Sequence, residues 1–129
     1  MATMTTAEKL ALLDRFFAAI QAGDLETVRA CYAPDAQIWH NNDNAIQGPA
    51  ENLPVLRWVS TNIKGMRYDD VRRTVMEDGR VFQQHVLRGT APNGQPLEVF
   101  ACIVFSFGGG CITRLDEYLD TGQTAVLRG

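Results

Sequence analysis

The chain has 129 residues, of which 46% are hydrophobic and 21% charged, and its formal net charge is −3. This length and composition favour a single domain over residues 1–129, with a core that needs no cross-links. A mildly acidic chain without a basic face argues against a nucleic-acid binder.

Targeting signals and metal-binding motifs are absent from the sequence. The N-terminus has no basic stretch followed by an apolar one, and no apolar segment is long enough to span a bilayer. The three cysteines show no C-x-x-C spacing, and two histidines are few for a zinc site. No glycine-rich nucleotide loop opens a helix. We therefore expect a cytoplasmic protein with no metal, no cofactor, and no membrane or nucleic-acid partner.

Helical spacing of apolar residues dominates the first half of the chain. Thr5 and Glu8 form a capping-box motif, and the apolar stripe that follows them ends at Gly23. Asp24 is a suitable cap for a second, shorter helix, which Pro34 would end. Two helices are therefore expected at the N-terminus.

A third helical region follows an extended segment over residues 36–40 and a polar loop over residues 41–44. It has two possible starts. The helix begins at Pro49 and kinks at Pro54, or Asn52 caps it and Pro54 lies in its first turn. The second start is favoured, because proline is best tolerated in the first turn of a helix.

From residue 66 onward, alternation of period two replaces the helical pattern. Asp78-Gly79 and Asn93-Gly94 are turn signals between the extended segments. The four predicted strands span residues 66–77, 80–90, 97–107 and 111–120. Helices followed by an antiparallel meander are the α+β pattern, in which the helices pack on one face of the sheet.

The strand over residues 97–107 is apolar on both faces. One face carries Leu97, Val99, Ala101, Ile103, Phe105 and Phe107, and the other carries Phe100, Cys102 and Val104. An antiparallel sheet in a small monomer usually leaves one face in contact with water. Because the helices can cover only one face, we expect a second copy of the chain on the other, in a homodimer formed through the sheet.

Glu117 is a lone carboxylate on an apolar strand face. The residues that share its face are Cys111, Thr113, Leu115 and Leu119. The opposite face holds Ile112, Arg114, Asp116, Tyr118 and Asp120. A carboxylate in apolar surroundings needs a partner or a shifted pKa, and a shifted pKa suits general acid–base catalysis. Glu117 is therefore the first candidate site residue.

Several short motifs share their order and spacing with one superfamily. They are Phe16-Phe17-Ala18-Ala19-Ile20 before Gly23-Asp24, Tyr32-Ala33-Pro34-Asp35-Ala36, Gly48-Pro49, Gly94-Gln95-Pro96 and the strand over residues 112–120. Over nearly its whole length the chain thus resembles the nuclear transport factor 2-like superfamily, and within it the SnoaL-like, ketosteroid isomerase-like and limonene epoxide hydrolase-like proteins. The resemblance implies a cone-shaped α+β barrel, with N-terminal helices packed on a curved antiparallel sheet and a pocket between them.

The resemblance also gives expectations for individual positions. Where ketosteroid isomerases carry a tyrosine, a general-base aspartate and a protonated acid, this chain has Phe16, His40 and a position near Ile103. Glu117 is similar in position to the aspartate on the last strand of the epoxide hydrolases and to the acid of the SnoaL-like cyclases. The remaining epoxide hydrolase groups fall near Gln84, so neither catalytic set is complete.

The candidate catalytic residues are Glu117, as acid or base, and His40, whose imidazole exchanges a proton near neutral pH. Strand register decides whether His85 or Gln84 is the polar pocket residue on the strand over residues 80–90, and the resemblance favours Gln84. The other candidates for lining the pocket are Phe16, Tyr32, Trp39, Trp58, Ala101, Ile103 and Leu115. Such aromatic and apolar walls suit an apolar ligand.

Together these residues and the resemblance predict a small-molecule pocket. The leading expectation is a cofactor-independent enzyme that performs acid–base chemistry, as an isomerase, cyclase, dehydratase or hydrolase, on an apolar oxygenated substrate. The alternative is a non-catalytic ligand-binding or protein-interaction module on the same fold, because neither known catalytic set is preserved.

Overall fold

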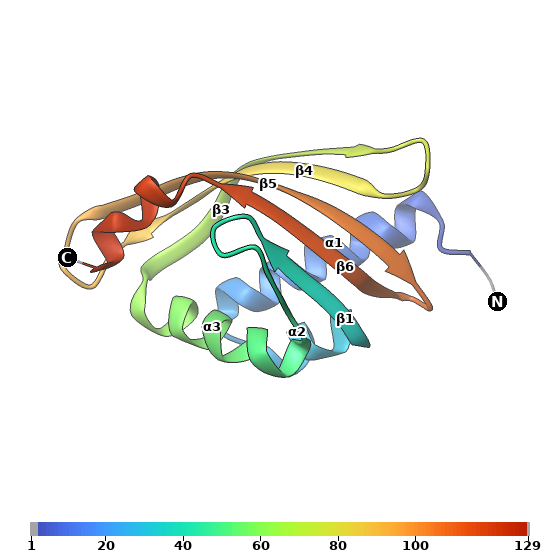
Figure 1. Ribbon diagram of the computed structural model, residues 1–129, viewed down its shortest axis with the longest axis horizontal. Coiled ribbons are helices and arrows are strands. Elements are labelled where there is room, and N and C mark those ends of the chain that lie inside the picture. The colour runs from blue at the N-terminus through green and yellow to red at the C-terminus, as the bar shows by residue number, and fades with distance from the viewer. Residues whose placement is uncertain (1–2, 129) are drawn as a thin grey trace.

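A computed structural model describes residues 3–128 of the chain (Figure 1). Its helices are α1 (Thr6–Ala22), α2 (Leu25–Cys31), α3 (Pro49–Asn62) and the 3-10 helix η1 (Thr121–Arg128). Its strands are β1 (Tyr32–His40), β2 (Ala45–Gln47), β3 (Lys64–Val75), β4 (Val81–Thr90), β5 (Pro96–Gly108) and β6 (Cys111–Leu119). The predicted helices and strands are therefore present, and β2 and η1 are additional. The second helix ends at Cys31, however, and Pro34, which was expected to end it, lies within β1.

The capping motif at the start of α1 forms as the sequence predicts. Thr5 Oγ1 accepts from the Glu8 N–H at 3.1 Å, and Glu8 Oε1 accepts from the Thr5 N–H at 2.8 Å. Gly23 ends the helix in the left-handed conformation, at φ 72°, where a side chain would be strained. The residues of α1 that are buried are Leu12, Leu13, Phe16, Phe17, Ala19 and Ile20.

α3 begins at Pro49 and not at Asn52, so the favoured start was wrong. Gly48 is the N-cap, and its N–H donates to Glu51 Oε1 at 3.0 Å. Pro49 occupies the first helical position, where its missing N–H would have had no partner within the helix. Pro54 consequently lies inside α3. The contact of Glu51 with Gly48 and a proline at the first helical position both favour a helix start at Pro49.

The strands form one six-stranded sheet in the order β2-β1-β6-β5-β4-β3. Neighbouring strands are antiparallel except for β1 and β6, which are parallel. The sheet is therefore mixed and open, with β2 and β3 at its edges. Figure 1 shows α1, α2 and α3 gathered on one face of this curved sheet. The expected α+β cone, with helices against the concave face, is confirmed.

Irregularities in strand pairing contribute to the curvature of the sheet. The register shifts twice between β3 and β4, and Asp70 has a positive φ of 55° at the second shift. It shifts once between β5 and β6, at Ser106 and Phe107. Such bulges bend a strand and increase its twist.

The bulge in the β5–β6 pair also changes the faces of β6. Phe105 pairs with Leu115, but Phe107 pairs with Ile112, so one residue of β6 is left extra between them. Ile112 is fully buried, although strict alternation had put it on the outer face. From Arg114 to the end of β6 the expected alternation holds, and this is the part of the strand that carries Glu117.

The core lies between α1 and the concave face of β5. Phe105 is fully buried, and its ring lies edge-on to those of Phe16 and Phe17 at centroid distances of 6.1 and 5.9 Å. On the other face of β5, Phe100 is 55% exposed. The apolar outer face expected from the sequence is thus present and is not covered by the helices.

The 3-10 helix η1 extends the sheet beyond the end of β6. Gln123 Oε1 accepts from the Phe100 N–H at 2.9 Å, and Gln123 Nε2 donates to the Phe100 carbonyl at 3.3 Å. One side-chain amide therefore replaces a strand neighbour at this position. Within residues 3–128, no helix has the length and apolar character needed to cross a membrane.

Candidate functional site

Two neighbouring strands place His40 and Glu117 side by side. His40 ends β1 and is paired in register with Glu117 of β6, which also pairs with Ile103 of β5. Residues paired in register on one face of a sheet have side chains within contact distance. His40 Nε2 lies 2.9 Å from Glu117 Oε1, and the two side chains are 24% and 20% exposed. The lone carboxylate of the sequence therefore has a partner, and the pair is half-buried.

The pair forms part of the wall of a cavity of about 40 Å³ between the helices and the sheet. The rest of the wall is mostly aromatic and aliphatic. Its residues are Phe16, Phe17, Ile20, Tyr32, Ile38, Asn52, Leu56, Tyr68, Ile103 and Leu115. A space of this size holds a few heavy atoms, and it is well below the volumes of about 300–1,000 Å³ typical of ligand pockets.

The surroundings of His40 favour its protonated form. Burial acts to lower the pKa of His40, but the hydrogen bond to Glu117, the charge of Glu117 and the charge of Asp43 together raise it above its ordinary value. The raised pKa therefore favours an imidazolium beside Glu117. One oxygen of Glu117 is engaged by His40, and the other remains able to accept a proton.

A second polar group in the cavity wall is already satisfied. The Tyr32 hydroxyl donates to Asn52 Oδ1 at 2.8 Å, and both residues are buried. Asn52 Nδ2 in turn donates to Gln47 Oε1 at 3.3 Å. This chain fixes the position of Tyr32 next to Phe16, with ring centroids 5.4 Å apart.

His85 lies in a buried hydrogen-bonded row that reaches the surface. Its Nδ1 is 2.8 Å from Nε2 of Gln83, and Gln83 Oε1 accepts from Arg73 Nε at 2.7 Å. The Arg73 guanidinium also pairs with the exposed Asp14. Burial lowers the pKa of His85, the charge of Glu117 raises it, and that of Arg73 lowers it, with a net decrease. His85 is therefore neutral near pH 7.

The structure brings six of the predicted site residues to this cavity. They are Glu117, His40, Phe16, Tyr32, Ile103 and Leu115. On β4, His85 is 4% exposed and faces the helices, whereas Gln84 is exposed on the outer face. The preference for Gln84 was wrong because Val81, Gln83 and His85 form the inward set.

Three other residues expected to line the pocket lie elsewhere. Trp39 is on the outer face of β1, where it packs against Tyr118 and donates to Asn44 Oδ1 at 2.8 Å. Trp58 is 43% exposed on α3, on the side away from the sheet-facing Leu53. Ala101 shares a face with Ile103 but sits further along β5, opposite His85, outside the cavity wall.

Sequence reasoning missed Tyr68, Asn52 and Gln83. Tyr68 is surrounded in sequence by charged residues, which hid that it shares an inward strand face with the buried Met66. Asn52 precedes Leu56 and Val59 at helical spacing, so the same periodicity that found the apolar stripe could have placed it inward.

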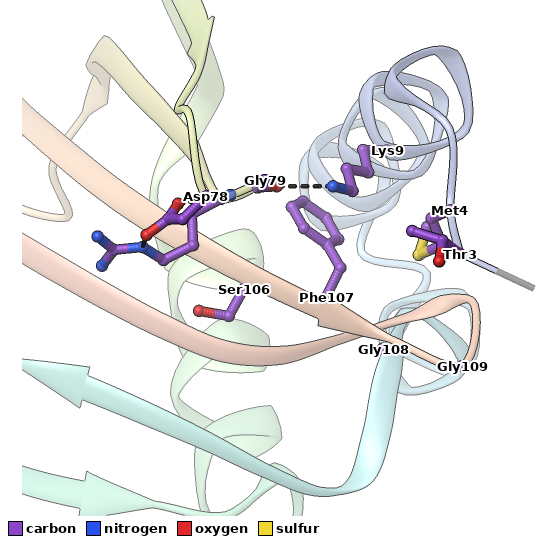
Figure 2. Close-up of a pocket in the computed structure, with 10 residues that line it drawn as sticks. Thr3, Met4, Lys9, Asp78, Gly79, Ser106, Phe107, Gly108 and Gly109 are labelled. Carbon is purple, nitrogen blue, oxygen red and sulfur yellow. Dashed lines mark hydrogen bonds and ion pairs between the residues drawn. The ribbon is translucent and has the colours of Figure 1, made fainter. Parts of the chain in front are cut away.

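A wider hollow of about 430 Å³ opens elsewhere on the surface, between the N-terminal segment and the β3–β4 and β5–β6 turns. Figure 2 shows that Lys9 spans it, donating to the Gly79 carbonyl at 2.7 Å beside Phe107. Because Lys9 is already bonded and no carboxylate–histidine pair is present, this hollow offers no comparable chemistry. Among residues 3–128, no cluster of three His, Cys, Asp or Glu side chains is arranged to hold a metal ion.

A curved sheet with helices packed on its concave face and a cavity between them defines the nuclear transport factor 2-like α+β cone. Within this class, the SnoaL-like domain family matches residues 13–115 of the chain. The chain belongs to this family, and the resemblance stated from the sequence is confirmed.

Solved structures with the same fold come from several bacteria. A proposed polyketide cyclase from Xanthomonas campestris pv. campestris superposes with a TM-score of 0.81 at 20% identity, covering 95% of this chain and 98% of that one. A protein of unknown function from Burkholderia pseudomallei, described as NTF2-like, gives 0.80 at 23%, covering 96% and 98%. A proposed isomerase from Bacillus subtilis gives 0.80 at 15%, covering 93% and 92%. No curated protein matches the chain.

Proposed function

We propose that this chain is a SnoaL-like enzyme that moves a proton on a small oxygenated substrate without a cofactor. The observation that carries the proposal is the His40–Glu117 pair, 2.9 Å apart in the wall of a mostly aromatic and aliphatic cavity. Apolar surroundings strengthen electrostatic interactions, and a positioned carboxylate can remove or return a proton there. Two structural neighbours, a proposed cyclase and a proposed isomerase, add support by analogy of fold only.

Glu117 is the proton acceptor in this proposal, through the oxygen that His40 does not engage. The protonated His40 holds the carboxylate in place and stabilises its charge, and the imidazolium can return a proton later in the reaction. The aromatic and aliphatic wall limits the contact of the pair with water, leaving His40 24% and Glu117 20% exposed. Isomerisation, cyclisation, dehydration and hydrolysis all require such a proton transfer.

The test is turnover by wild-type protein and by Glu117→Gln on a panel of small carbonyl, hydroxy and epoxide compounds. A positioned general acid or base contributes roughly 10²–10⁴-fold, so the variant should lose at least about 100-fold in kcat. Asp116→Asn is the matched control, because Asp116 lies on the opposite face of β6 and pairs with Arg114. Equal turnover by Glu117→Gln and wild type would remove Glu117 from the chemistry.

A second candidate is a binding module without chemistry, because the chain does not keep the full catalytic set of either the ketosteroid isomerases or the epoxide hydrolases. A space of about 40 Å³ admits a fused-ring substrate only if side chains such as Leu56 of α3 move aside. Tight binding of a panel compound by wild type, with no conversion over prolonged incubation, would support the binding role. A protein-interaction role on this fold predicts instead that no panel compound binds.

A further inference from the structure

Tyr68 brings an unused donor to the cavity. It lies on β3 and lines the cavity together with the His40–Glu117 pair. Its backbone N–H donates to Gln21 Oε1 at 2.8 Å, but within residues 3–128 its hydroxyl has no hydrogen-bond partner. The Tyr32 hydroxyl is by contrast already bonded to Asn52. Of the two tyrosines in the wall, Tyr68 is therefore the one free to bind a ligand.

Aromatic rings hold the Tyr68 ring in place. Phe17 packs on it at a centroid distance of 4.6 Å, and His85 lies edge-on to it at 5.1 Å with an interplanar angle of 87°. His85 also contacts Phe17, at 5.7 Å. The imidazole thus supports Tyr68 from outside the cavity wall.

The row behind His85 fixes its tautomer. Arg73 can only donate, so the group of Gln83 that it contacts is the carbonyl oxygen Oε1, and Nε2 of Gln83 must point at His85. The amide nitrogen also only donates, so Nδ1 of His85 must accept and the ring proton resides on Nε2. The arginine at one end of the row therefore sets the protonation pattern of the histidine at the other.

We propose that the Tyr68 hydroxyl is the donor that holds an oxygen atom of the ligand in this cavity, and that His85, locked as its neutral Nε2–H tautomer by Gln83 and Arg73, positions the Tyr68 ring. Burial, followed by the charge of Glu117, raises the pKa of Tyr68, so its hydroxyl keeps its proton. A neutral donor on one wall and a carboxylate on another suit a small carbonyl compound with an acidic C–H bond. Glu117 would take the carbon-bound proton while Tyr68 binds the oxygen on which negative charge develops.

This inference deepens the proposed function, but its test measures binding and not turnover. Acetone and 2-methylpropene are the probes, because they have nearly the same shape and only acetone has an acceptor oxygen. Binding is followed by NMR shifts of the Ile103 and Leu115 methyl groups, which line the cavity. Tyr68→Phe should weaken acetone binding about 2- to 12-fold, the effect of one neutral hydrogen bond, and leave 2-methylpropene unchanged.

Tyr118→Phe is the matched control, because Tyr118 is 46% exposed on the outer face and loses the same hydroxyl. Equal acetone affinity in wild type and Tyr68→Phe, or no acetone binding by wild type, would overturn the assignment of Tyr68. If Tyr68→Phe has the expected effect while Glu117→Gln leaves turnover unchanged, the donor stands and the acid–base proposal fails. If Glu117→Gln loses turnover while Tyr68→Phe binds acetone as wild type does, the acid–base proposal stands and the assignment of Tyr68 fails.

The positioning role of His85 has its own measurement. Long-range ¹H–¹⁵N NMR of wild type should show Nε2 protonated and Nδ1 not, and the opposite pattern would overturn this role. Gln83→Glu places an acceptor at Nδ1, which should draw the proton there and reduce the preference for acetone over 2-methylpropene. Gln84→Glu is the control, since Gln84 is the exposed neighbour. Should Gln83→Glu fail to fold, the wild-type tautomer alone decides.

Discussion

The two histidines of the chain have opposite environments. Burial lowers the pKa of both, but at His40 the hydrogen bond and charge of Glu117 outweigh it, whereas at His85 burial and Arg73 prevail. An NMR titration of the two imidazole signals should therefore give one midpoint above the ordinary histidine value and one below it. Glu117→Gln should move both midpoints downward and the upper one further, because it removes a hydrogen bond and a charge that raise the pKa of His40 but only a charge that raises the pKa of His85.

Asp116→Asn is the control for this titration, since its carboxylate is bonded to Arg114 on the other face of β6. An upper midpoint that stays in place in Glu117→Gln would show that the ion pair does not govern His40. Two midpoints that coincide would contradict the different burial and partners of the histidines.

The raised pKa of His40 makes its contribution to stability depend on pH. The folded state binds this proton more tightly than the unfolded state, so the contribution is fully present below the ordinary histidine pKa. It is lost as the pH rises through the raised folded-state pKa. The difference in unfolding free energy between wild type and His40→Asn should therefore shrink from about pH 5.5, where carboxylates are ionised, to about pH 8.5.

Urea unfolding of both proteins at several pH values measures this difference. His85 has the opposite sign, because its lowered pKa costs stability as the pH falls below the ordinary value, but both proteins retain His85 and its effect cancels. A difference that stays constant over this range would show that His40 is not stabilised in its charged form.

At the scale of the elements, β3 and β4 approach so closely at Gly89 that a side chain has no room. A Cβ at this position would lie 2.5 Å from Ile63 Cγ2 and 3.0 Å from the carbonyl oxygen of Lys64. Gly89→Ala should therefore push β3 away and destabilise the fold by about 1–3 kcal/mol, as overpacking does. Since Tyr68 lies on the same strand pair, the cavity wall should shift as well.

Urea unfolding of Gly89→Ala measures this cost, with Gly48→Ala as the comparison. A Cβ at Gly48 would meet only Glu51 Oε1, at 3.7 Å, which is ordinary contact. If both variants unfolded at the same urea concentration, the close approach of β3 to Gly89 would have no energetic consequence.

The local patterns in the sequence predicted the elements better than their exact faces. Glu117 was placed correctly because alternation is unbroken from Arg114 to the end of β6. Ile112 was misplaced because a bulge before Arg114 adds one residue, and nothing in the local sequence marks that residue. The ambiguity between His85 and Gln84 had the same origin, since a one-residue slip exchanges the two faces of a strand.

The sequence patterns could not predict contacts between elements that lie far apart in the chain. The alternation of side chains along β6 marked Glu117 as unusual. Its pairing with His40, however, depends on β1 lying parallel to β6, and the predicted antiparallel meander did not include a parallel pair. Tyr68 joins the site only because β3 and β4 curve around α1. The row from Asp14 to His85 links α1, β3 and β4, so no spacing rule within one element could reveal it.

At the scale of the whole molecule, the outer face of the sheet has no covering element among the described residues. Three of its apolar side chains are exposed: Ile46 by 51%, Phe100 by 55% and Tyr118 by 46%. Trp39 of β1, the strand between β2 and β6, lies on the same face. Arg114 and Asp116 also lie on this face and form an ion pair, with Arg114 Nε 2.9 Å from Asp116 Oδ1. An apolar face with paired charges of this kind can complement itself, as a two-fold contact between identical chains requires.

We propose that a second copy of the chain covers this outer face, so that the protein is a homodimer formed through the sheet. Light scattering over a concentration series should give twice the chain mass of 14.3 kDa, and Phe100→Glu should shift the protein toward the monomer. A charge buried at an interface without a partner is costly, so a glutamate at this position should disfavour the dimer. Phe100 is exposed in the single chain, so the variant should still fold. Val55→Glu on α3 is the control, because Val55 is also exposed but lies on a helix away from the sheet. A wild-type protein that remains monomeric at every concentration would exclude the dimer, and the outer face would then have to be explained by a different partner.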